Sequence, residues 1–371
     1  MKLLITGDFV INRPYNTSQI SDEVKNLFTQ SDYNIVNLEA PVTESNSKIL
    51  KTGPHLKADK HSVLEVLKYL NINQCTLANN HVLDYDEQGV LDTLNFCKEN
   101  NIETVGAGKN KEEAAKIFYL DTEVGKIAFI NMAENEWASA TETTAGANGM
   151  DLIDDVKAIQ EAKEQSDIVF VFVHGGLEYY NFPSPDIQKQ YRFYVDNGAD
   201  LVVGHHTHCI SGMENYKGKS IYYSLGNFLF TKDNIHSDWY TGLILEINIS
   251  KGELKTKCHP IHQDKTDFQL SFLEGSEKEK LLNRFNKYSE IIQNPLRLKD
   301  AWNSLIVTKS NSYLNYWSPL IFIENRYIKA FFIKTGIRFI NKKGMAYYLN
   351  LMRCETHFNI SKTIIKNYIR K

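Results

Sequence analysis

Polar residues that can bind a metal ion stand directly after several short apolar segments of this sequence. They occupy five such places: Asp8, Glu39, Asn80 with His81, His174, and the pair His206 and His208. If the segments are strands of an open α/β sheet, these side chains meet at its carboxyl edge, where ligands of such sheets bind. Carboxylate, amide and imidazole donors with no cysteine among them favour Mn, Fe or Zn over a thiolate site. The pattern therefore predicts a site for a divalent metal.

Each of these residues also has a purely structural interpretation. Asp8 follows a glycine and could lie in a turn, Asn80 could build an Asx-turn, and His174 could be a core histidine after six apolar residues. His206 and His208 alternate, so in an extended segment both would point to one side. Chance could place one such residue after a strand, but five together favour one shared site.

The segments before these residues have the length and composition of buried strands, and helical patterns separate them. The predicted strands are Lys2–Thr6, Asn34–Asn37, Gln74–Ala78, Asp167–Val173 and Ala199–Val203. The predicted helices are Ser21–Thr29, His61–Leu70, Glu87–Glu99, Asp151–Gln165 and Pro185–Asn197. The second helix carries a capping-box pattern that begins at Ser62. This alternation predicts an α/β fold.

Antiparallel strands and a change of pattern follow toward the C-terminus. Two hairpins are predicted at Phe118–Asn131 and Gly212–Ser224, and a closing pair at Thr241–Ile249 with Glu253–Pro260. From Asp264 onward the sequence changes to helical patterns with Lys and Arg on one side. We therefore predict one domain over residues 1–264 and a helical, basic, aromatic-rich region over residues 265–371.

The composition is that of a globular protein. The 371 residues carry a net charge of −3, with 42% hydrophobic and 23% charged residues, which excludes collagen-like and disordered classes. No window of the sequence reads as a transmembrane helix, and the first motif at residue 8 leaves no room for a signal peptide. The five cysteines are scattered and odd in number, which argues for a reduced compartment, so the expected location is the cytoplasm.

The charge is distributed unevenly along the chain. Residues 281–371 contain 16 Lys and Arg but only 4 Asp and Glu, a local net charge of +12, together with many aromatic residues. Such a region suits an anionic membrane surface or a polyanion. The alternative is a helical subdomain that packs its apolar face on the main body. Nucleic acid is not expected as a partner, because no recognition motif accompanies the charge.

Six motifs occur along the chain in a recognisable order. They are Gly7-Asp8, Asn37-Leu-Glu-Ala-Pro41, Leu77-Ala-Asn-Asn-His-Val-Leu-Asp84, His174-Gly-Gly-Leu-Glu-Tyr179, Gly204-His-His-Thr-His208 and Tyr223-Ser-Leu-Gly-Asn-Phe228. As a set they resemble the CapA family of bacterial capsule, or poly-γ-glutamate, synthesis proteins. The resemblance implies a four-layer α/β/β/α sandwich of the calcineurin-like metallophosphoesterase type, with a two-metal centre.

The resemblance also implies which residues would bind metal. The six candidate ligands are Asp8, Glu39, Asn80, His174, His206 and His208. Asp8 and His208 would hold the first ion, Glu39 would take the place of the bridging carboxylate, and the other three would hold the second ion. A pair of divalent ions polarises a phosphoryl oxygen and activates a water molecule.

Further roles fall on residues beside these ligands. His81 would be the general acid for the leaving oxygen, and Asp84 would fix its tautomer, so these two are the candidate catalytic residues. Glu178, Tyr179 and Asn227 are the candidates for the substrate pocket, although Asn227 could equally serve a turn.

Three positions depart from the family's pattern. Val10 stands where the broader phosphoesterase pattern has a histidine, so the site could hold one ion or two. Gly175 replaces a usual tryptophan, which would open that wall of the pocket. His205 adds one histidine to the Gly-His-x-His pattern and could replace His206 as a ligand, although its place at the strand end points it away.

These observations lead to a main functional hypothesis and two alternatives. The first is a metal-dependent, phosphoesterase-like hydrolase that acts in synthesis of a capsule or surface polymer, with a polymer or phosphoester as substrate. The second is a non-catalytic assembly or export component that binds a polyanion at the membrane. The third is a generic cytosolic phosphodiesterase. The basic C-terminal region predicts peripheral contact with the inner membrane face for a protein that is otherwise cytoplasmic.

Overall fold

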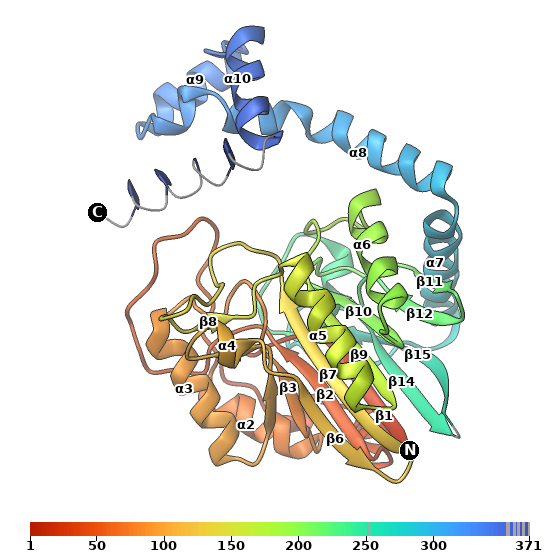
Figure 1. The fold of residues 1–371 in the computed structure, drawn as a ribbon. Helices are drawn as coiled ribbons and strands as arrows, with labels where there is room; N and C mark the ends of the chain where they lie inside the picture. The colour runs from red at the N-terminus through yellow and green to blue at the C-terminus, as the bar shows by residue number, and fades with distance from the viewer. Residues whose placement is uncertain (251, 354–356, 359–360, 362–363, 366–367, 370–371) are drawn as a thin grey trace. The chain divides into compact units, whose positions relative to one another are not determined.

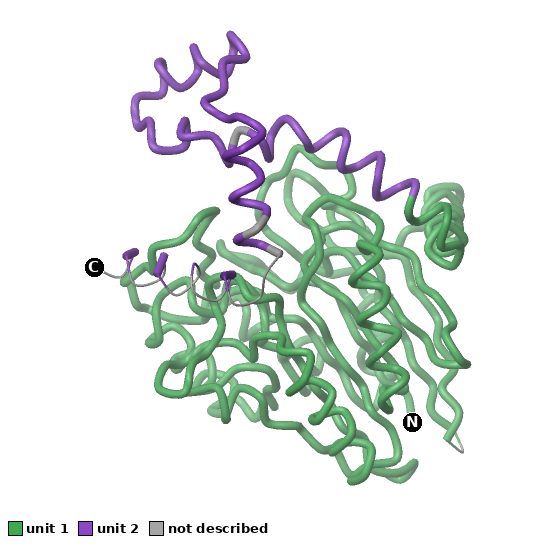
Figure 2. Tube along the Cα trace, turned by 45° about the horizontal axis from the view of Figure 1, so that its top comes forward, with its two compact units in different colours: residues 1–299 green, residues 300–371 purple. Residues whose placement is uncertain are grey.

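A computed structural model of the chain describes residues 1–250, 252–353, 357–358, 361, 364–365 and 368–369 (Figure 1). The chain forms two compact units, Met1–Lys299 and Asp300–Lys371 (Figure 2). All strands of the described residues belong to the first unit.

Two mixed sheets form the centre of the first unit. The larger sheet has the order β16 (Leu270–Phe272), β15 (Glu253–Gln263), β14 (Thr241–Ser250), β1 (Lys2–Val10), β2 (Tyr33–Leu38), β3 (Gln74–Thr76) and β4 (Glu103–Val105), and β13 (Asn227–Phe230) also pairs with β1. The second has the order β11 (Met213–Tyr216), β12 (Lys219–Tyr222), β10 (Leu201–His205), β9 (Ile168–His174), β7 (Gly125–Ala133) and β6 (Phe118–Thr122). A short pair, β5 (Ala107–Gly108) and β8 (Gly146–Ala147), stands apart from both.

Helices cover the outer face of each sheet. α1 (Asp22–Thr29), α2 (Lys60–Tyr69) and α3 (Asp86–Glu99) pack on the larger sheet, and α5 (Leu152–Gln165) and α6 (Pro185–Asp196) pack on the second. The remaining helices are the short α4 (Lys111–Ala114), then α7 (Gly275–Gln293), α8 (Pro295–Tyr316), α9 (Arg326–Thr335) and α10 (Lys342–Arg353). Three 3₁₀ helices lie at Thr17–Gln19, Ser237–Tyr240 and Pro319–Phe322.

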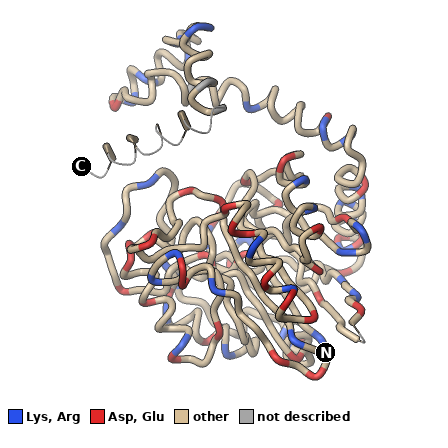
Figure 3. Tube along the Cα trace, in the orientation of Figure 1, with Lys and Arg blue, Asp and Glu red and all other residues tan. Residues whose placement is uncertain are grey.

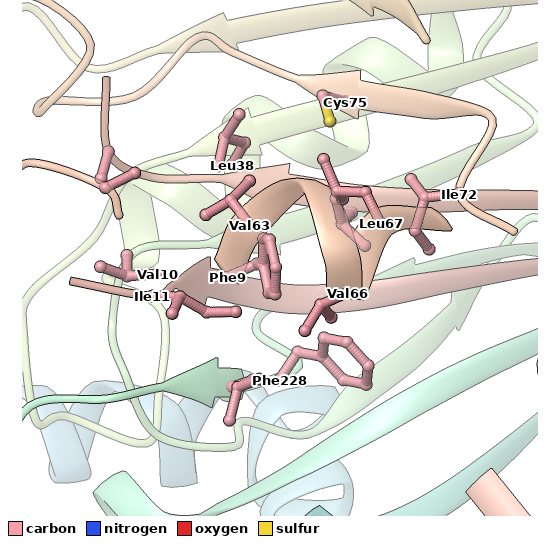
Figure 4. Packing of buried hydrophobic residues seen from close by; sticks show 14 of the residues in the cluster. Phe9, Val10, Ile11, Leu38, Val63, Val66, Leu67, Ile72, Cys75 and Phe228 are labelled. Atoms are coloured by element: carbon pink, nitrogen blue, oxygen red, sulfur yellow. The ribbon is translucent and has the colours of Figure 1, made fainter. Parts of the chain in front are cut away.

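Three apolar clusters correspond to the three interfaces between these layers. One lies between α1–α3 and the larger sheet, where Figure 4 shows Phe9 and Val10 of β1 among side chains of α2. A second joins the facing sides of the two sheets, with Ile5 from one and Phe129 from the other. The third lies under α5 and α6. Together they confirm the predicted α/β/β/α sandwich.

The elements predicted from periodicity are present, with ends that shift by a few residues. The five parallel-sheet strands, the five helices, both hairpins and the closing pair all form where their patterns indicated. The capping box predicted at Ser62 is wrong. Asp59 caps α2 by accepting a hydrogen bond from the Ser62 N–H, and the Ser62 hydroxyl accepts one from the Tyr15 N–H.

The region after residue 264 is not uniform. Leu281 and Phe285 of α7 join the cluster between the two sheets, so this helix belongs to the sandwich. The first compact unit ends at Lys299, whereas the predicted domain boundary lies at residue 264. The cysteines Cys75, Cys97, Cys209 and Cys258 are free thiols, and Cys354 lies outside the described residues.

Close backbone packing at Gly7 holds the next residue, Asp8, in place. A Cβ at Gly7 would lie 1.8 Å from the carbonyl oxygen of Gly226, which in turn accepts a hydrogen bond from the Asp8 N–H. Backbone cannot rotate away as a side chain can, so we expect Gly7→Ala to reach the upper end of the usual overpacking range, a loss of about 3 kcal/mol in the free energy of unfolding. Urea denaturation measures this loss, and an unchanged midpoint would contradict the close contact.

Candidate metal centre

The predicted ligands come from the carboxyl edges of both sheets. Asp8 lies near the end of β1 and Glu39 directly follows β2, its parallel neighbour. His174 is the last residue of β9, and His206 follows the end of the neighbouring strand β10. All four side chains are buried. The two-sheet sandwich therefore brings residues that are far apart in the sequence into one place.

Two groups of buried donors could each hold a metal ion. One consists of Asp8, Glu39 and His208, and the other of Glu39, His174 and His206, and within each group the ligand atoms lie within 4.8 Å of one another. Glu39 belongs to both groups. Glu39 is the residue that the family resemblance implies as the bridging carboxylate.

Distances within the groups are short. In the first, His208 Nδ1 lies 3.2 Å from Asp8 Oδ2, and His208 Nε2 lies 3.7 Å from Glu39 Oε1. In the second, His174 Nε2 lies 3.3 Å from Glu39 Oε1 and 3.2 Å from His206 Nδ1. The side-chain oxygen of Asn80 completes the second group, 3.1 Å from His174 Nε2.

The surroundings of the Glu39 carboxylate favour a bound cation. Both of its oxygens are fully buried and neither has a hydrogen-bond partner among the described residues. Burial raises the pKa of Glu39 well above its usual range, and the nearby charges of Asp8, Glu178 and Asp84 raise it further. A buried carboxylate without partners is costly unless it is neutralised or coordinates a metal. Oxygen and imidazole donors in this number suit Mn, Fe or Zn.

His174 and His206 are held in the neutral form that a metal ligand requires. Burial lowers the pKa of His206 to about 3, with a further contribution from His208. Burial and His206 likewise lower the pKa of His174 well below its usual range. For Asp8, burial opposes ionisation, but the hydrogen bond and charge of His208 outweigh it and the pKa is lowered.

His206 and His208 were predicted to lie in an extended segment. The loop that carries them is instead sharply turned. Both residues have left-handed backbone conformations, with φ of 90° and 54°. Non-glycine residues rarely adopt such angles, and they persist where the surrounding structure enforces them, commonly at functional sites. The strained turn, rather than strand alternation, brings both imidazoles to Glu39.

Comparison with known proteins identifies the family of this chain. Residues 2–232 match the family model described as bacterial capsule synthesis protein PGA_cap. The chain belongs to this family. It is 39% identical over 233 residues to the PGA biosynthesis protein CapA of Bacillus subtilis, covering 61% of each chain. It is 31% identical over 284 residues to the capsule biosynthesis protein CapA of Bacillus anthracis, covering 71% of this chain and 69% of the relative.

The chain spans about three fifths of the length of the B. subtilis relative. Among solved structures, a phosphatase from Mycoplasma pneumoniae aligns with 72% of this chain and 95% of its own, with 14% identity and a TM-score of 0.45.

The predicted catalytic pair forms a direct contact. His81 Nδ1 lies 2.6 Å from Asp84 Oδ2, and both side chains are buried. The Asp84 carboxylate also accepts a hydrogen bond from the Leu56 N–H at 2.7 Å. Asp84 therefore fixes the orientation of the His81 ring and ties it to the loop that precedes α2.

The predicted pocket residues divide into two kinds. Asn227 belongs to the centre, because its Oδ1 lies 3.0 Å from His208 Nδ1. Tyr179 is 37% exposed and has a left-handed backbone with φ of 62°, and its ring stacks on His236 at 4.1 Å. Glu178 is half-buried, and its charge contributes to the raised pKa of Glu39.

The three departures from the family's pattern have different consequences. Val10 is buried in the apolar cluster under α2 (Figure 4), so it offers nothing to the metal centre. Gly175 does not open the pocket wall, because a Cβ there would lie 2.6 Å from Cγ of Glu134, whose side chain fills the space. His205 Nε2 lies 3.0 Å from the carbonyl oxygen of Thr6, and the ring is in neither donor group.

Three residues near the centre were missed by sequence reasoning. Asn37 donates a hydrogen bond to Asp8 Oδ1 at 2.7 Å and lies 3.2 Å from His174 Nδ1. Lys51 pairs with Asp84 and lies 3.2 Å from His81 Nδ1, and Glu136 Oε1 lies 3.6 Å from His206 Nε2. Asn37 could have been found, because it precedes Glu39 by two and shares its side of the strand.

A matched pair of substitutions tests the choice between His205 and His206. We expect His206→Gln to lower the affinity for Mn²⁺ at least tenfold, since it removes a buried donor that lies 3.2 Å from His174, whereas His205→Gln should leave it unchanged. Calorimetric titration with Mn²⁺ measures both. If His205→Gln lowered the affinity for Mn²⁺ and His206→Gln did not, His205 would be the ligand.

Proposed function

We propose that this protein is a metal-dependent hydrolase of the phosphoester type that acts in synthesis of a capsule or related surface polymer. The observation that carries the proposal is the buried Glu39 carboxylate, which has no hydrogen-bond partner in the part of the chain that the structure describes and is shared by two groups of donors. Asp8 and His208 would hold one ion with it, and His174, His206 and Asn80 the other.

The chain's own residues supply the rest of the chemistry. Divalent ions bound at both groups would polarise a phosphoryl oxygen and activate a water molecule. His81, oriented by Asp84, would donate a proton to the leaving oxygen. Asn37 would hold Asp8 and His174 in register, because its amide contacts both side chains. The exposed Tyr179 would line the entrance for the substrate.

The biological role rests on the relatives. Those with CapA in their names are described as PGA and capsule biosynthesis proteins, which supports a polymer of the poly-γ-glutamate or polysaccharide type, or a precursor of it, as the substrate. The four cysteines of the described residues are free thiols, which supports a location in the reducing cytoplasm.

Metal content and turnover test the proposal together. Purified protein should contain two ions per chain, and it should hydrolyse bis(p-nitrophenyl) phosphate faster with added Mn²⁺ than after chelation. This substrate has a good leaving group, so its hydrolysis does not depend on the assignment of His81. If the protein binds ions but hydrolyses neither this ester nor polymer precursors, the proposal that it is an enzyme is wrong.

A second function is favoured by one observation. Val10 is fully buried among apolar side chains where the broader phosphoesterase pattern has a histidine ligand, so one ion could be bound more weakly. In that case the protein would be a non-catalytic assembly or export component that uses the centre to bind a polyanion. One ion per chain without turnover, together with retention of poly-γ-glutamate, is the expected result for this alternative. Efficient hydrolysis of unrelated phosphodiesters would instead favour a generic phosphodiesterase.

A further inference from the structure

The second compact unit exposes apolar side chains that a folded protein normally buries. In α9, Tyr327 is 70%, Phe331 59% and Ile328 48% exposed, and no residue of this helix is buried. These three residues lie on one face, since Phe331 stands four positions after Tyr327 and three after Ile328, and residues at these spacings are neighbours on a helix. An apolar helix face of this kind usually packs on a core, and an exposed one marks an interaction site.

The helix is built as a regular amphipathic element. The Asn325 side chain caps its start by accepting hydrogen bonds from the N–H groups of Tyr327 and Ile328, and Gly336 ends it in a left-handed conformation with φ of 72°. Both ends thus have the chemistry that helix termini need. The exposed face is therefore not the result of a badly formed helix.

The charge of this unit identifies the kind of surface that it fits. Residues 300–371 contain 12 Lys and Arg and only 3 Asp and Glu. α9 carries Arg326, Lys329 and Lys334 and no acidic residue, and α10 likewise combines basic residues with the exposed Tyr347. The basic positions of these two helices are blue in Figure 3, and neither helix contains an acidic residue. The partner must be anionic and must also accept apolar side chains.

We propose that α9 and α10 form a peripheral binding surface for an anionic lipid bilayer. Basic side chains meet the headgroups while Tyr, Phe and Ile enter the boundary with the acyl chains, which is how interfacial amphipathic helices bind. None of the described helices is long and apolar enough to cross a membrane. A soluble polyanion would engage only the basic residues, and a second copy of this unit would bring two strongly positive surfaces together.

Vesicle sedimentation of the full-length protein tests the surface. The protein should partition onto vesicles that contain phosphatidylglycerol at least tenfold more strongly than onto pure phosphatidylcholine, and less at high salt. Two double variants separate the contributions. Lys329→Glu with Lys334→Glu should weaken partitioning about 25-fold or more, because each basic residue near the surface contributes about fivefold. Tyr327→Ser with Phe331→Ser should weaken it at least about tenfold, because two aromatic side chains no longer bury apolar surface in the bilayer.

Matched controls lie on the exposed part of α5 in the first unit. Ile153→Ser and Lys157→Glu make the same kinds of change at exposed positions and should leave partitioning unaltered. Equal binding by wild type and both α9 variants would overturn the proposal. So would binding to soluble polyglutamate that needs the lysines but not Tyr327 and Phe331, or self-association without lipid that either variant abolishes. None of these readouts depends on phosphoester hydrolysis.

Discussion

Glu39→Gln is expected to abolish binding at both ion positions while leaving the metal-free protein at least as stable as wild type. Glu39 is the residue common to the two donor groups, so its loss removes a charged ligand from each. The glutamine keeps the shape of the side chain but not its charge. Because both carboxylate oxygens are buried and find no hydrogen-bond partner among the residues described by the structure, neutralising this group should relieve a cost in the metal-free fold.

Glu39→Gln should thus remove the stabilisation by metal but not lower the stability of the metal-free protein. A residue with a purely structural role would lower the stability of the metal-free protein when it is substituted. At Mn²⁺ concentrations about a hundredfold above Kd, wild type should gain about 2.7 kcal/mol of stability, which raises Tm on the order of 5 °C. The variant should gain nothing, and its metal-free Tm should be equal or higher. Thermal unfolding with and without Mn²⁺ measures both quantities.

Glu134→Gln provides the control for this substitution. Glu134 is a half-buried carboxyl whose pKa is raised by burial, and it belongs to neither donor group. The control should therefore retain the Mn²⁺-dependent rise in Tm. If Glu39→Gln kept that rise as well, the bridging assignment would be wrong.

The elements that position this centre could be predicted from the sequence because they depend on local patterns. Apolar runs such as those of β1 and β9 indicate buried strands, and the polar residue that follows each run marks the carboxyl edge. The clustering of Asp8, Glu39 and His174 then follows from the parallel order of the strands in each sheet and from the packing of the two sheets. The cap of α2 was misread because Asp59 competes with Ser62, and only the observed hydrogen bond identifies which residue caps.

Contacts made by irregular segments could not be predicted in the same way. Lys51 lies in the loop between β2 and α2, where no periodicity fixes the direction of a side chain, yet its Nζ is buried beside His81 and Asp84. The conformations of His206 and His208 depend on a strained turn that the surrounding protein enforces. The filling of the space beside Gly175 by Glu134 likewise depends on two segments that are distant in sequence.

Removal of the His81 imidazole is expected to affect the chemical step without affecting the metal. His81 belongs to neither donor group, and its Nδ1 contacts Asp84, so His81→Ala should bind Mn²⁺ like wild type. If His81 protonates the leaving oxygen, its loss should lower kcat by about 10²–10⁴ for an alkyl phosphodiester. For bis(p-nitrophenyl) phosphate the loss should be much smaller, because p-nitrophenolate leaves without a proton.

The dependence on the leaving group distinguishes a proton donor from a residue that shapes the pocket. A structural defect would slow both substrates equally, whereas loss of a proton donor slows only the ester with the basic leaving group. Lys51→Met gives a further comparison, since it removes the ammonium group that contacts Asp84 and His81 but keeps the imidazole. It should lower kcat more for the alkyl ester than for bis(p-nitrophenyl) phosphate, because a displaced ring donates its proton less effectively and only the alkyl leaving group needs that proton. Equal losses on the two esters in His81→Ala would assign His81 to a positioning role and leave the proton to solvent.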